Sequence, residues 1–299
     1  MNPLSYDYQK PNQPPHDPTQ FRISASQFSK FFDSTSQWCH QHLLGESGFL
    51  GNTASVAGTV LHHLAEQHTL NQSISEQDRA DIAEYIALQA SDDVVADDVL
   101  PRVRPMWNVL KEHITEHPIS LPEPFIQVAT GNPGIFVGGS IDGIIDLTDP
   151  SASYQSLDDL PRDHQYKVID YKSTSSKTPP KSFSKQYDWQ LLTYAYALST
   201  IGINVVEVEL IFILQEHIGA ISEKTGKQLK SYPAAVHTLA KSITSDDLAF
   251  IQSLINLVSD SAFRFITTPS DRYLIAQDYR LVNNNQPLPF VTKPQSIDI

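Results

Sequence analysis

The segment YKVIDYKSTSSK, residues 166–177, joins a short β-branched run to a polar loop. Val168 and Ile169 predict a strand that continues into Asp170, Tyr171 and Lys172. Alternate residues of a strand point to the same face, so Asp170 and Lys172 are expected to face one site together. The pattern leaves two interpretations open, a surface salt bridge or a reaction centre.

A second carboxylate stands in the apolar segment GGSIDGIIDL, residues 138–147. Burying Asp142 there is costly unless the carboxylate is paired or binds a metal ion, although a strand end facing solvent is the simpler alternative. Asp146 lies four residues further on and could share its face. Carboxylate oxygens suit Mg²⁺ or Mn²⁺. Asp142 and Asp170 on neighbouring strands therefore predict a site for such an ion, with Lys172 orienting or activating a water.

Two helical segments carry further candidates. In GTVLHHLAE, residues 58–66, His62 and Glu66 are four apart and share a helix face. In QLLTY, Gln190 and Tyr194 have the same spacing. Taken alone, such a histidine is more often a surface or core residue, and such a tyrosine is more often packed beside a polar edge.

Hydrophobic periodicity predicts an α/β fold. Apolar residues recur at helical spacing in some segments and alternate in others. We expect a mixed β-sheet flanked by helices, with an N-terminal helical elaboration, and a parallel neighbour for the strand at 204–214, which is reached through a helix. The predicted helices are 55–70, 75–90, 101–116, 182–202 and 245–265. The predicted strands are 125–129, 166–172 and 204–214, together with 134–147, which is expected to be a bent strand or a hairpin broken at Gly138 and Gly139.

Composition indicates one domain and its surroundings. The 299 residues are enough for one large domain or two small ones, with a sizeable core. We expect a disordered, Pro-rich leader at 1–20, a single domain at 21–270 and a C-terminal tail at 271–299. The domain divides into a helical part at 21–118 and an α/β core at 119–270. With neither a long apolar run nor a signal-peptide pattern, a cytoplasmic location without membrane contact is expected.

Charge and cysteine content limit the partners and cofactors. A formal net charge of −13 argues against nucleic acid, which prefers a basic surface. Lys177, Lys181 and Lys185 nevertheless gather after the D-x-K segment, as a local basic lip or as an ordinary solvated loop. Cys39 is the only cysteine, so one chain cannot form a disulfide or an iron–sulfur cluster.

The motifs occur in an order that resembles the RecB-like branch of the PD-(D/E)XK nuclease superfamily. That branch has G-x-x-x-H-x-x-x-E on a helix, an Asp on a strand after glycine, (D/E)-x-K, and then Q-x-x-x-Y. The opening SASQFSKFF is similar to its S-x-S start. One departure is Asp170, where the branch usually has Glu, and another is the lack of cluster-binding cysteines. The matching residues are Gly58, His62, Glu66, Asp142, Asp170, Lys172, Gln190 and Tyr194.

The resemblance implies a role for each position. The catalytic residues would be Lys172, Asp142 and Asp170. The metal ligands would be His62, Asp142, Asp170 and the backbone carbonyl of Tyr171. Glu66 would orient His62, and Glu123 would be a further functional acid. Gln190 and Tyr194 would contact DNA or support the site, and Lys177, Lys181 and Lys185 would contact phosphates.

The resemblance also implies a function. The expected protein is a Mg²⁺- or Mn²⁺-dependent DNA nuclease, and more narrowly an exonuclease in DNA repair, recombination or phage DNA processing. Because no P-loop motif is present, unwinding would come from a partner such as a helicase, with a recombinase or a single-strand-binding protein as other candidate partners. The alternatives are a non-catalytic DNA-binding scaffold and a metal-dependent hydrolase of another substrate. The complete set of motif residues favours the nuclease.

Overall fold

The computed structural model describes residues 20–44, 52–70, 74–219, 227–228 and 230–276. Short 3₁₀ turns lie at Ala25–Gln27, Leu157–Asp159 and Pro269–Asp271, and a π-helical segment lies at Cys39–Leu43. In chain order, the strands and longer helices are β1 (Phe21–Ser24), α1 (Phe28–Asp33), α2 (Thr35–Trp38), α3 (Thr53–Thr69), α4 (Glu76–Leu88), α5 (Ala96–Glu116), β2 (Leu121–Pro122), β3 (Phe125–Ala129), β4 (Ile135–Ser140), β5 (Gly143–Asp146), β6 (Gln165–Thr174), α6 (Lys185–Thr200), β7 (Asn204–Leu214), β8 (Ala235–Ser242), α7 (Ser245–Thr267) and α8 (Arg272–Ala276).

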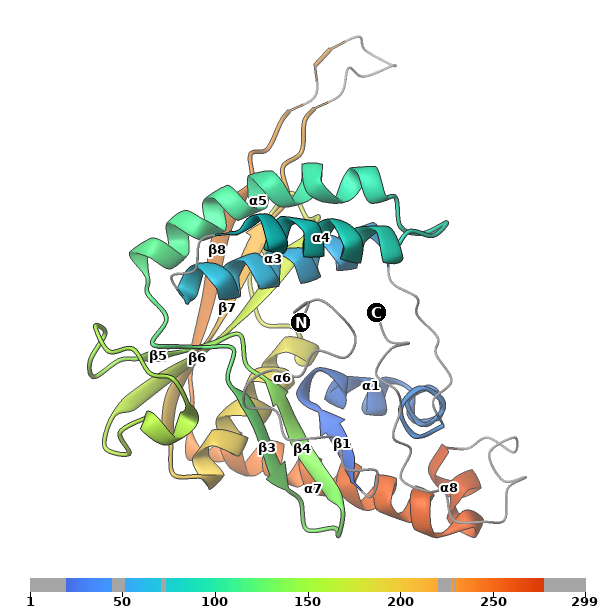
Figure 1. Cartoon of the computed structure of the whole chain (residues 1–299). Helices are drawn as coiled ribbons and strands as arrows, with labels where there is room; N and C mark the ends of the chain where they lie inside the picture. Colours follow the sequence, from blue (N-terminus) through green and yellow to red (C-terminus); the bar gives the residue numbers. More distant parts are fainter. Residues whose placement is uncertain (1–19, 45–51, 71–73, 220–226, 229, 277–299) are drawn as a thin grey trace.

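The described strands form two mixed sheets flanked by helices, as the α/β prediction requires (Figure 1). The larger sheet has the order β2-β5-β6-β7-β8, and the smaller has the order β1-β4-β3. The strands β6 and β7 pair in parallel, which confirms the expectation for the segment at 204–214. The helices α3, α4 and α5 lie together above the larger sheet in Figure 1, and α6 lies on its other face.

Alternating burial along β6 explains this layering. Tyr166 and Val168 belong to the core that α6 and α7 complete. Ile169 and Tyr171 belong to a separate core with α3 and α5. Because consecutive strand residues point to opposite faces, a strand that is apolar at both parities is covered on both sides.

The segment at 134–147 is not one bent strand or hairpin but two strands in different sheets. β4 pairs with β3 in the smaller sheet, whereas β5 pairs with β6 in the larger one. Gly138 and Gly139 have φ of 151° and 156°, a region that residues with a Cβ rarely adopt. A Cβ at Gly138 would lie 2.0 Å from the carbonyl oxygen of Ile126, so only glycine permits this close pairing of β4 with β3.

Three other expectations differ from the structure. The strands β1 and β8 were not predicted, because β1 is short and β8 lies at a sheet edge with mostly half-buried side chains. The helix α5 begins at Ala96, before the predicted start, and contains Pro101 and Pro105 in its interior. Its buried face, which includes Val99 and Val103, continues through both prolines and offsets the lost hydrogen bonds.

The predicted domain limits fall partly outside the described residues. The leader at 1–20 is almost wholly outside them, as is most of the tail at 271–299. Within the described part of that tail, Arg272 is buried and its Nε donates to the carbonyl oxygen of Phe265 at 3.1 Å. Among the described helices, none combines the length and the apolar character that a membrane crossing requires.

Candidate active site

Two acidic side chains lie where the chain passes from one sheet to the other. Glu123 separates β2 of the larger sheet from β3 of the smaller one, and Asp142 separates β4 from β5. The Glu123 N–H donates to the carbonyl oxygen of Asp142 at 3.3 Å, so the two crossings lie side by side. Glu123 has a φ of 48°, in the left-handed region, and such backbone strain is concentrated at functional sites.

Asp142 is bonded on both sides. The backbone N–H of Tyr171 donates to one carboxylate oxygen at 2.6 Å, and His62 Nδ1 lies 3.3 Å from the other. Burial alone would raise the pKa of Asp142, but His62, Lys172 and the Tyr171 N–H together lower it to about 2. Asp142 is therefore ionised at neutral pH, as a group that binds a cation should be.

His62 reaches this carboxylate because α3 approaches β6 closely. The helix begins with a capping box between Asn52 and Ser55. One turn before His62, a Cβ at Gly58 would lie 3.2 Å from the hydroxyl oxygen of Ser173, so the glycine permits the contact between helix and strand. Burial lowers the pKa of His62, but the charge and hydrogen bond of Asp142 outweigh burial and raise it overall.

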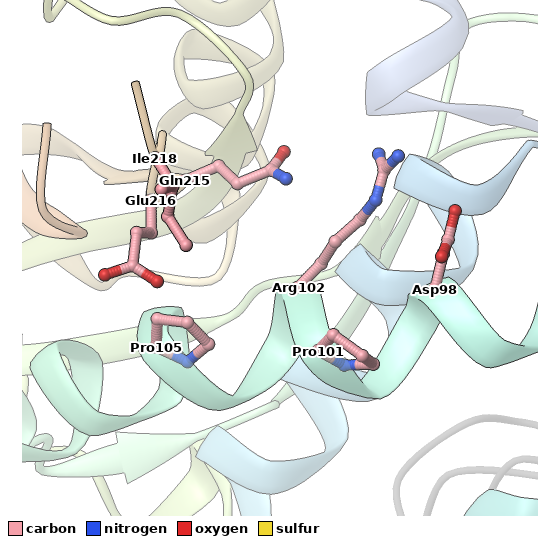
Figure 2. Close-up of a pocket in the computed structure, with 7 residues that line it drawn as sticks. All are labelled: Asp98, Pro101, Arg102, Pro105, Gln215, Glu216 and Ile218. Carbon is pink, nitrogen blue, oxygen red and sulfur yellow. The ribbon is translucent and has the colours of Figure 1, made fainter. Parts of the chain in front are cut away.

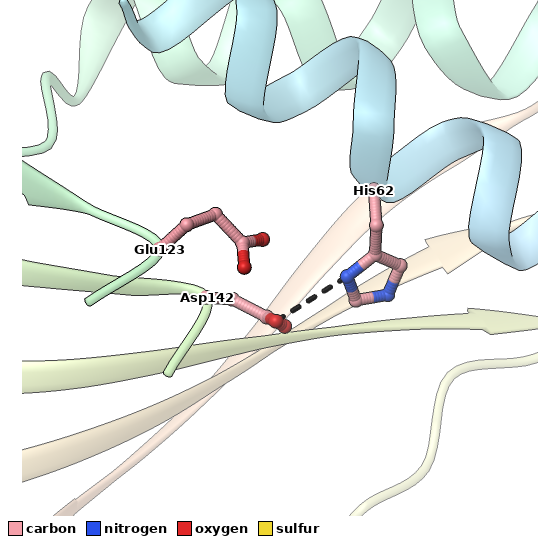
Figure 3. A group of neighbouring side chains, drawn as sticks. All are labelled: His62, Glu123 and Asp142. Atoms are coloured by element: carbon pink, nitrogen blue, oxygen red, sulfur yellow. Dashed lines mark ion pairs between the residues drawn. The ribbon is translucent and has the colours of Figure 1, made fainter. Parts of the chain in front are cut away.

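Figure 3 shows the side chains of His62, Glu123 and Asp142 converging from α3 and the two crossings. One donor atom of each residue lies within 4.8 Å of those of the other two. One imidazole nitrogen and two carboxylate oxygens match the donors that Mg²⁺ and Mn²⁺ accept. The residues present therefore fit a divalent metal ion.

Asp170 and Lys172 lie next to this cluster on the α6 side of β6. The Lys172 ammonium forms an ion pair with the Asp170 carboxylate, and Gln190 Nε2 donates to the other Asp170 oxygen at 3.0 Å. The Asp170 side chain is only 3% exposed, so the pair is not a surface salt bridge. Asp170 is not among the three residues whose donor atoms cluster, and Glu123, which has no motif of its own, is.

Burial and the opposite charges of the two groups together set the pKa values of Asp170 and Lys172. Burial raises the pKa of Asp170, and the Lys172 ammonium opposes this shift without cancelling it. Burial lowers the pKa of Lys172, but Asp170 and Asp142 outweigh burial and raise it above its ordinary value. Lys172 is therefore protonated at neutral pH and can donate hydrogen bonds to a phosphate or a water.

The backbone of Tyr171 connects the Asp170–Lys172 pair to the cluster of His62, Glu123 and Asp142. Its N–H points toward Asp142, beyond the end of β5. In an extended strand the N–H and C=O of one residue point to the same edge, so the Tyr171 carbonyl oxygen also lies on the Asp142 side. That position is the one expected of a carbonyl ligand.

The remaining sequence candidates divide into three groups. Gln190 and Tyr194 lie within the site, both buried, and a Cβ at Gly139 would contact the Tyr194 hydroxyl at 3.4 Å. If Glu66 oriented the ring of His62, a hydrogen bond would join the two side chains. In the described part of the chain, no such hydrogen bond is formed. Lys185 pairs with Asp33 at 2.5 Å, while Lys177 and Lys181 are exposed.

Asp146 does not share the face of Asp142, contrary to expectation. Asp142 lies in the bend before β5, whereas Asp146 ends β5 and is fully buried. Its carboxylate accepts hydrogen bonds from the Tyr154 hydroxyl at 2.7 Å and from His164 Nδ1 at 2.6 Å. The backbone N–H groups of Thr148 and Asp149 also donate to it, so it closes the loop after β5.

Sequence reasoning missed one aromatic neighbour of the lysine. The Lys172 ammonium lies 5.5 Å from the ring centre of Tyr187, close enough for a cation–π contact. Tyr187 precedes Gln190 by three residues and Tyr194 by seven, which is the spacing of one helix face. From this helical spacing, the sequence could have predicted that Tyr187 lies on the same face as Gln190 and Tyr194.

A separate cavity lies between α5 and the segment that follows β7 (Figure 2). It has a volume of about 340 Å³ and shares no residue with the candidate site. Two acids and one arginine face it, so its lining does not favour an anionic ligand. The lining residues are Asp98, Pro101, Arg102, Pro105, Gln215, Glu216 and Ile218.

Comparison with models of protein families shows to which family the chain is related. The family model described as the PD-(D/E)XK nuclease superfamily matches residues 22–265, which include both crossings, α3, β6 and α6. The chain belongs to the PD-(D/E)XK nuclease superfamily. This match confirms the resemblance at the level of the superfamily and supports a nuclease activity.

Two solved structures are similar to this PD-(D/E)XK chain. One is described as the "Putative exonuclease" from Eubacterium rectale, with 11% identity and a TM-score of 0.48, covering 82% of this chain and 81% of that chain. The other is LHK-Exo in complex with dAMP, with 10% identity and a TM-score of 0.28, covering 73% of this chain and 98% of that chain. A comparison with curated protein sequences finds no match.

Proposed function

We propose that the protein is a Mg²⁺- or Mn²⁺-dependent deoxyribonuclease that hydrolyses phosphodiester bonds. The observation that supports this most strongly is the cluster of His62, Glu123 and Asp142 beside a buried Asp170–Lys172 pair. A bound divalent ion there would supply Lewis acidity toward a phosphate oxygen and lower the pKa of a bound water. Asp170 and the Tyr171 carbonyl would complete the set of ligands.

The protein groups have separate tasks in this proposal. Asp142 stays ionised and, with His62 and Glu123, would hold the divalent metal ion in place. Lys172, whose raised pKa makes it a poor general base, donates hydrogen bonds that place the attacking water and offset charge on the phosphate in the transition state. Gln190 donates a hydrogen bond to Asp170 and so orients its carboxylate beside Lys172.

We further propose that the nuclease acts on DNA ends, in DNA repair, recombination or phage DNA processing. This narrower activity rests on the order of the four motifs, which resembles the RecB-like branch. A helicase, a recombinase or a single-strand-binding protein would then supply or protect the DNA end.

A degradation assay on end-labelled DNA tests the proposal. Linear and circular, single- and double-stranded substrates are compared in Mg²⁺, Mn²⁺ or EDTA, with Lys172→Ala and the exposed control Lys111→Ala. We expect metal-dependent loss of linear but not circular DNA, lost in Lys172→Ala and kept in the control. Cleavage of circular DNA would indicate an endonuclease instead. DNA binding without cleavage in any metal would favour a non-catalytic DNA-binding scaffold.

A further inference from the structure

The segments that leave β7 and enter β8 run side by side away from the larger sheet, at the top of Figure 1. We call residues 215–219 and 230–234 the arm. His217 and Tyr232 face each other across it and exchange both backbone hydrogen bonds, each 2.8 Å long. Residues paired in this way project their side chains to the same face.

The arm is attached to the loop that follows the D-x-K segment. The Gln215 N–H donates to the carbonyl oxygen of Thr174 at 2.9 Å, and His217 Nε2 lies 2.7 Å from that of Ser175. Lys177 follows in this loop, five residues after Lys172. Five residues span at most about 18 Å, so the backbone of Lys177 lies within that distance of Lys172 in the candidate active site.

Two lysines meet at one aromatic ring there. The ammonium of Lys177 lies 5.9 Å from the ring centre of Tyr232, and that of Lys230 lies 4.9 Å from it. Both lysines are exposed, whereas the tyrosine is half-buried. The ring attracts each cation through its quadrupole and so holds both near one point.

Within the part of the chain that the structure describes, no acid pairs with either cation. Over the described ranges, Lys177 and Lys230 form no ion pair, whereas Lys185 pairs with Asp33, and Lys241 with two aspartates. The carboxylate of Glu216 turns instead toward the cavity beside α5 (Figure 2). In a chain with net charge −13, two neighbouring unpaired cations repel each other and favour an anion between them.

We propose that Lys177, Lys230 and Tyr232 form a phosphate-binding site for the DNA strand that enters the active site. This inference rests on the proposed function and adds a contact from the arm, which no motif predicts. The lysines bind backbone phosphates, and Tyr232 keeps both ammoniums in place. Such contacts carry no sequence information, so the site would act on any DNA sequence.

Binding to fluorescent single-stranded DNA, measured by anisotropy in EDTA at several salt concentrations, tests the site without requiring cleavage. The variant is Lys177→Gln/Lys230→Gln. Its matched control is Lys111→Gln/Arg162→Gln, which removes two exposed charges elsewhere. Losing two phosphate contacts should reduce the slope of log affinity against log salt by about 1.4 and weaken binding, while the control keeps the wild-type slope.

Tyr232 gives a second, independent measurement. Tyr232→Phe keeps the ring and should bind like the wild type, whereas Tyr232→Leu removes it and should weaken binding in the direction of the lysine variant. Thermal melting of every variant establishes that each is folded.

The outcomes separate the two proposals. An unchanged slope and affinity in a folded Lys177→Gln/Lys230→Gln variant would overturn the arm site while leaving the nuclease proposal standing. A wild-type protein that binds DNA but cleaves none overturns the nuclease proposal. In that case the salt slopes of the wild type and the lysine variant still test the phosphate-binding site on the arm. A wild-type protein that does not bind DNA overturns both.

Discussion

At the scale of single residues, the site is a balance between burial and charge. Asp142 and Asp170 are both removed from water, yet the pKa of Asp142 is lowered to about 2 while that of Asp170 is raised. The difference lies in their partners. The imidazole of His62, the Lys172 ammonium and the Tyr171 N–H lower the pKa of Asp142, whereas burial and the neighbouring Asp142 charge raise that of Asp170 more than Lys172 and His62 lower it.

Gln190 gives a prediction at this scale. Gln190→Leu removes the hydrogen bond to Asp170, so the pKa of Asp170 should rise further. We expect cleavage to fall by about 10- to 100-fold, as for other residues that orient ligands, and the protein to lose about 1–3 kcal/mol of stability. Cleavage rates, DNA affinity and denaturant melts measure these effects, with the exposed Gln186→Leu on the same helix as control. Lost DNA affinity with an unchanged cleavage rate would instead make Gln190 a DNA contact.

At the scale of secondary-structure elements, the distance between α3 and β6 sets the position of His62. Gly58→Ala places a Cβ 3.2 Å from the Ser173 hydroxyl, which can rotate away, and gains up to about 1 kcal/mol of helix propensity. We therefore expect Gly58→Ala to be tolerated.

Gly58→Val should behave differently, because its branched side chain cannot be accommodated by a hydroxyl rotation. We expect it to cost about 1–3 kcal/mol and to reduce cleavage by moving His62 away from Asp142. Thermal melts and cleavage assays are compared with the exposed neighbour Thr59→Val, and Ser173→Gly should restore part of the loss. Full activity in Gly58→Val would show that the close approach is not needed.

The end of β5 gives a pH prediction. The hydrogen bond to Asp146 raises the pKa of His164, so its contribution to stability is complete below the unfolded pKa of about 6.5 and is lost as pH rises through the folded pKa. Burial raises the pKa of Asp146, but its hydrogen bonds lower it overall, so its contribution is lost only as pH falls below about 4.

The melting temperature of His164→Gln should therefore fall furthest below that of the wild type between about pH 4 and 6.5, and the gap should narrow by pH 9. Thermal melts across this pH range measure the gap. A gap that does not change with pH would show that His164 contributes only as a neutral hydrogen-bond donor.

At the scale of the whole molecule, the candidate metal-binding cluster of His62, Glu123 and Asp142 joins three parts of the fold. Its donors come from α3 and from both crossings between the sheets. An ion bound there stabilises the folded chain by about 2.7 kcal/mol at one hundred times its Kd. We expect Mg²⁺ or Mn²⁺ to raise the Tm by several degrees, an effect weakened in Glu123→Gln and retained in the exposed control Glu112→Gln. Equal shifts in both variants would exclude Glu123 as a ligand.

The sequence by itself determined much of this protein. Strand alternation placed Asp170 and Lys172 on one face, and helical spacing placed Gln190 and Tyr194 together, because both relations are local. The glycines before Asp142 marked a break in the chain, and the order of the four motifs indicated the superfamily that the family comparison then showed.

Only the tertiary structure decided the rest. Glu123 joins His62 and Asp142 because two crossings between sheets lie side by side, and no local pattern records which strands belong to which sheet. The sequence allowed Asp146 to share the face of Asp142, yet Asp146 closes a loop with His164. Long-range pairing determines these positions, since each depends on segments whose contact is formed only when both sheets are assembled.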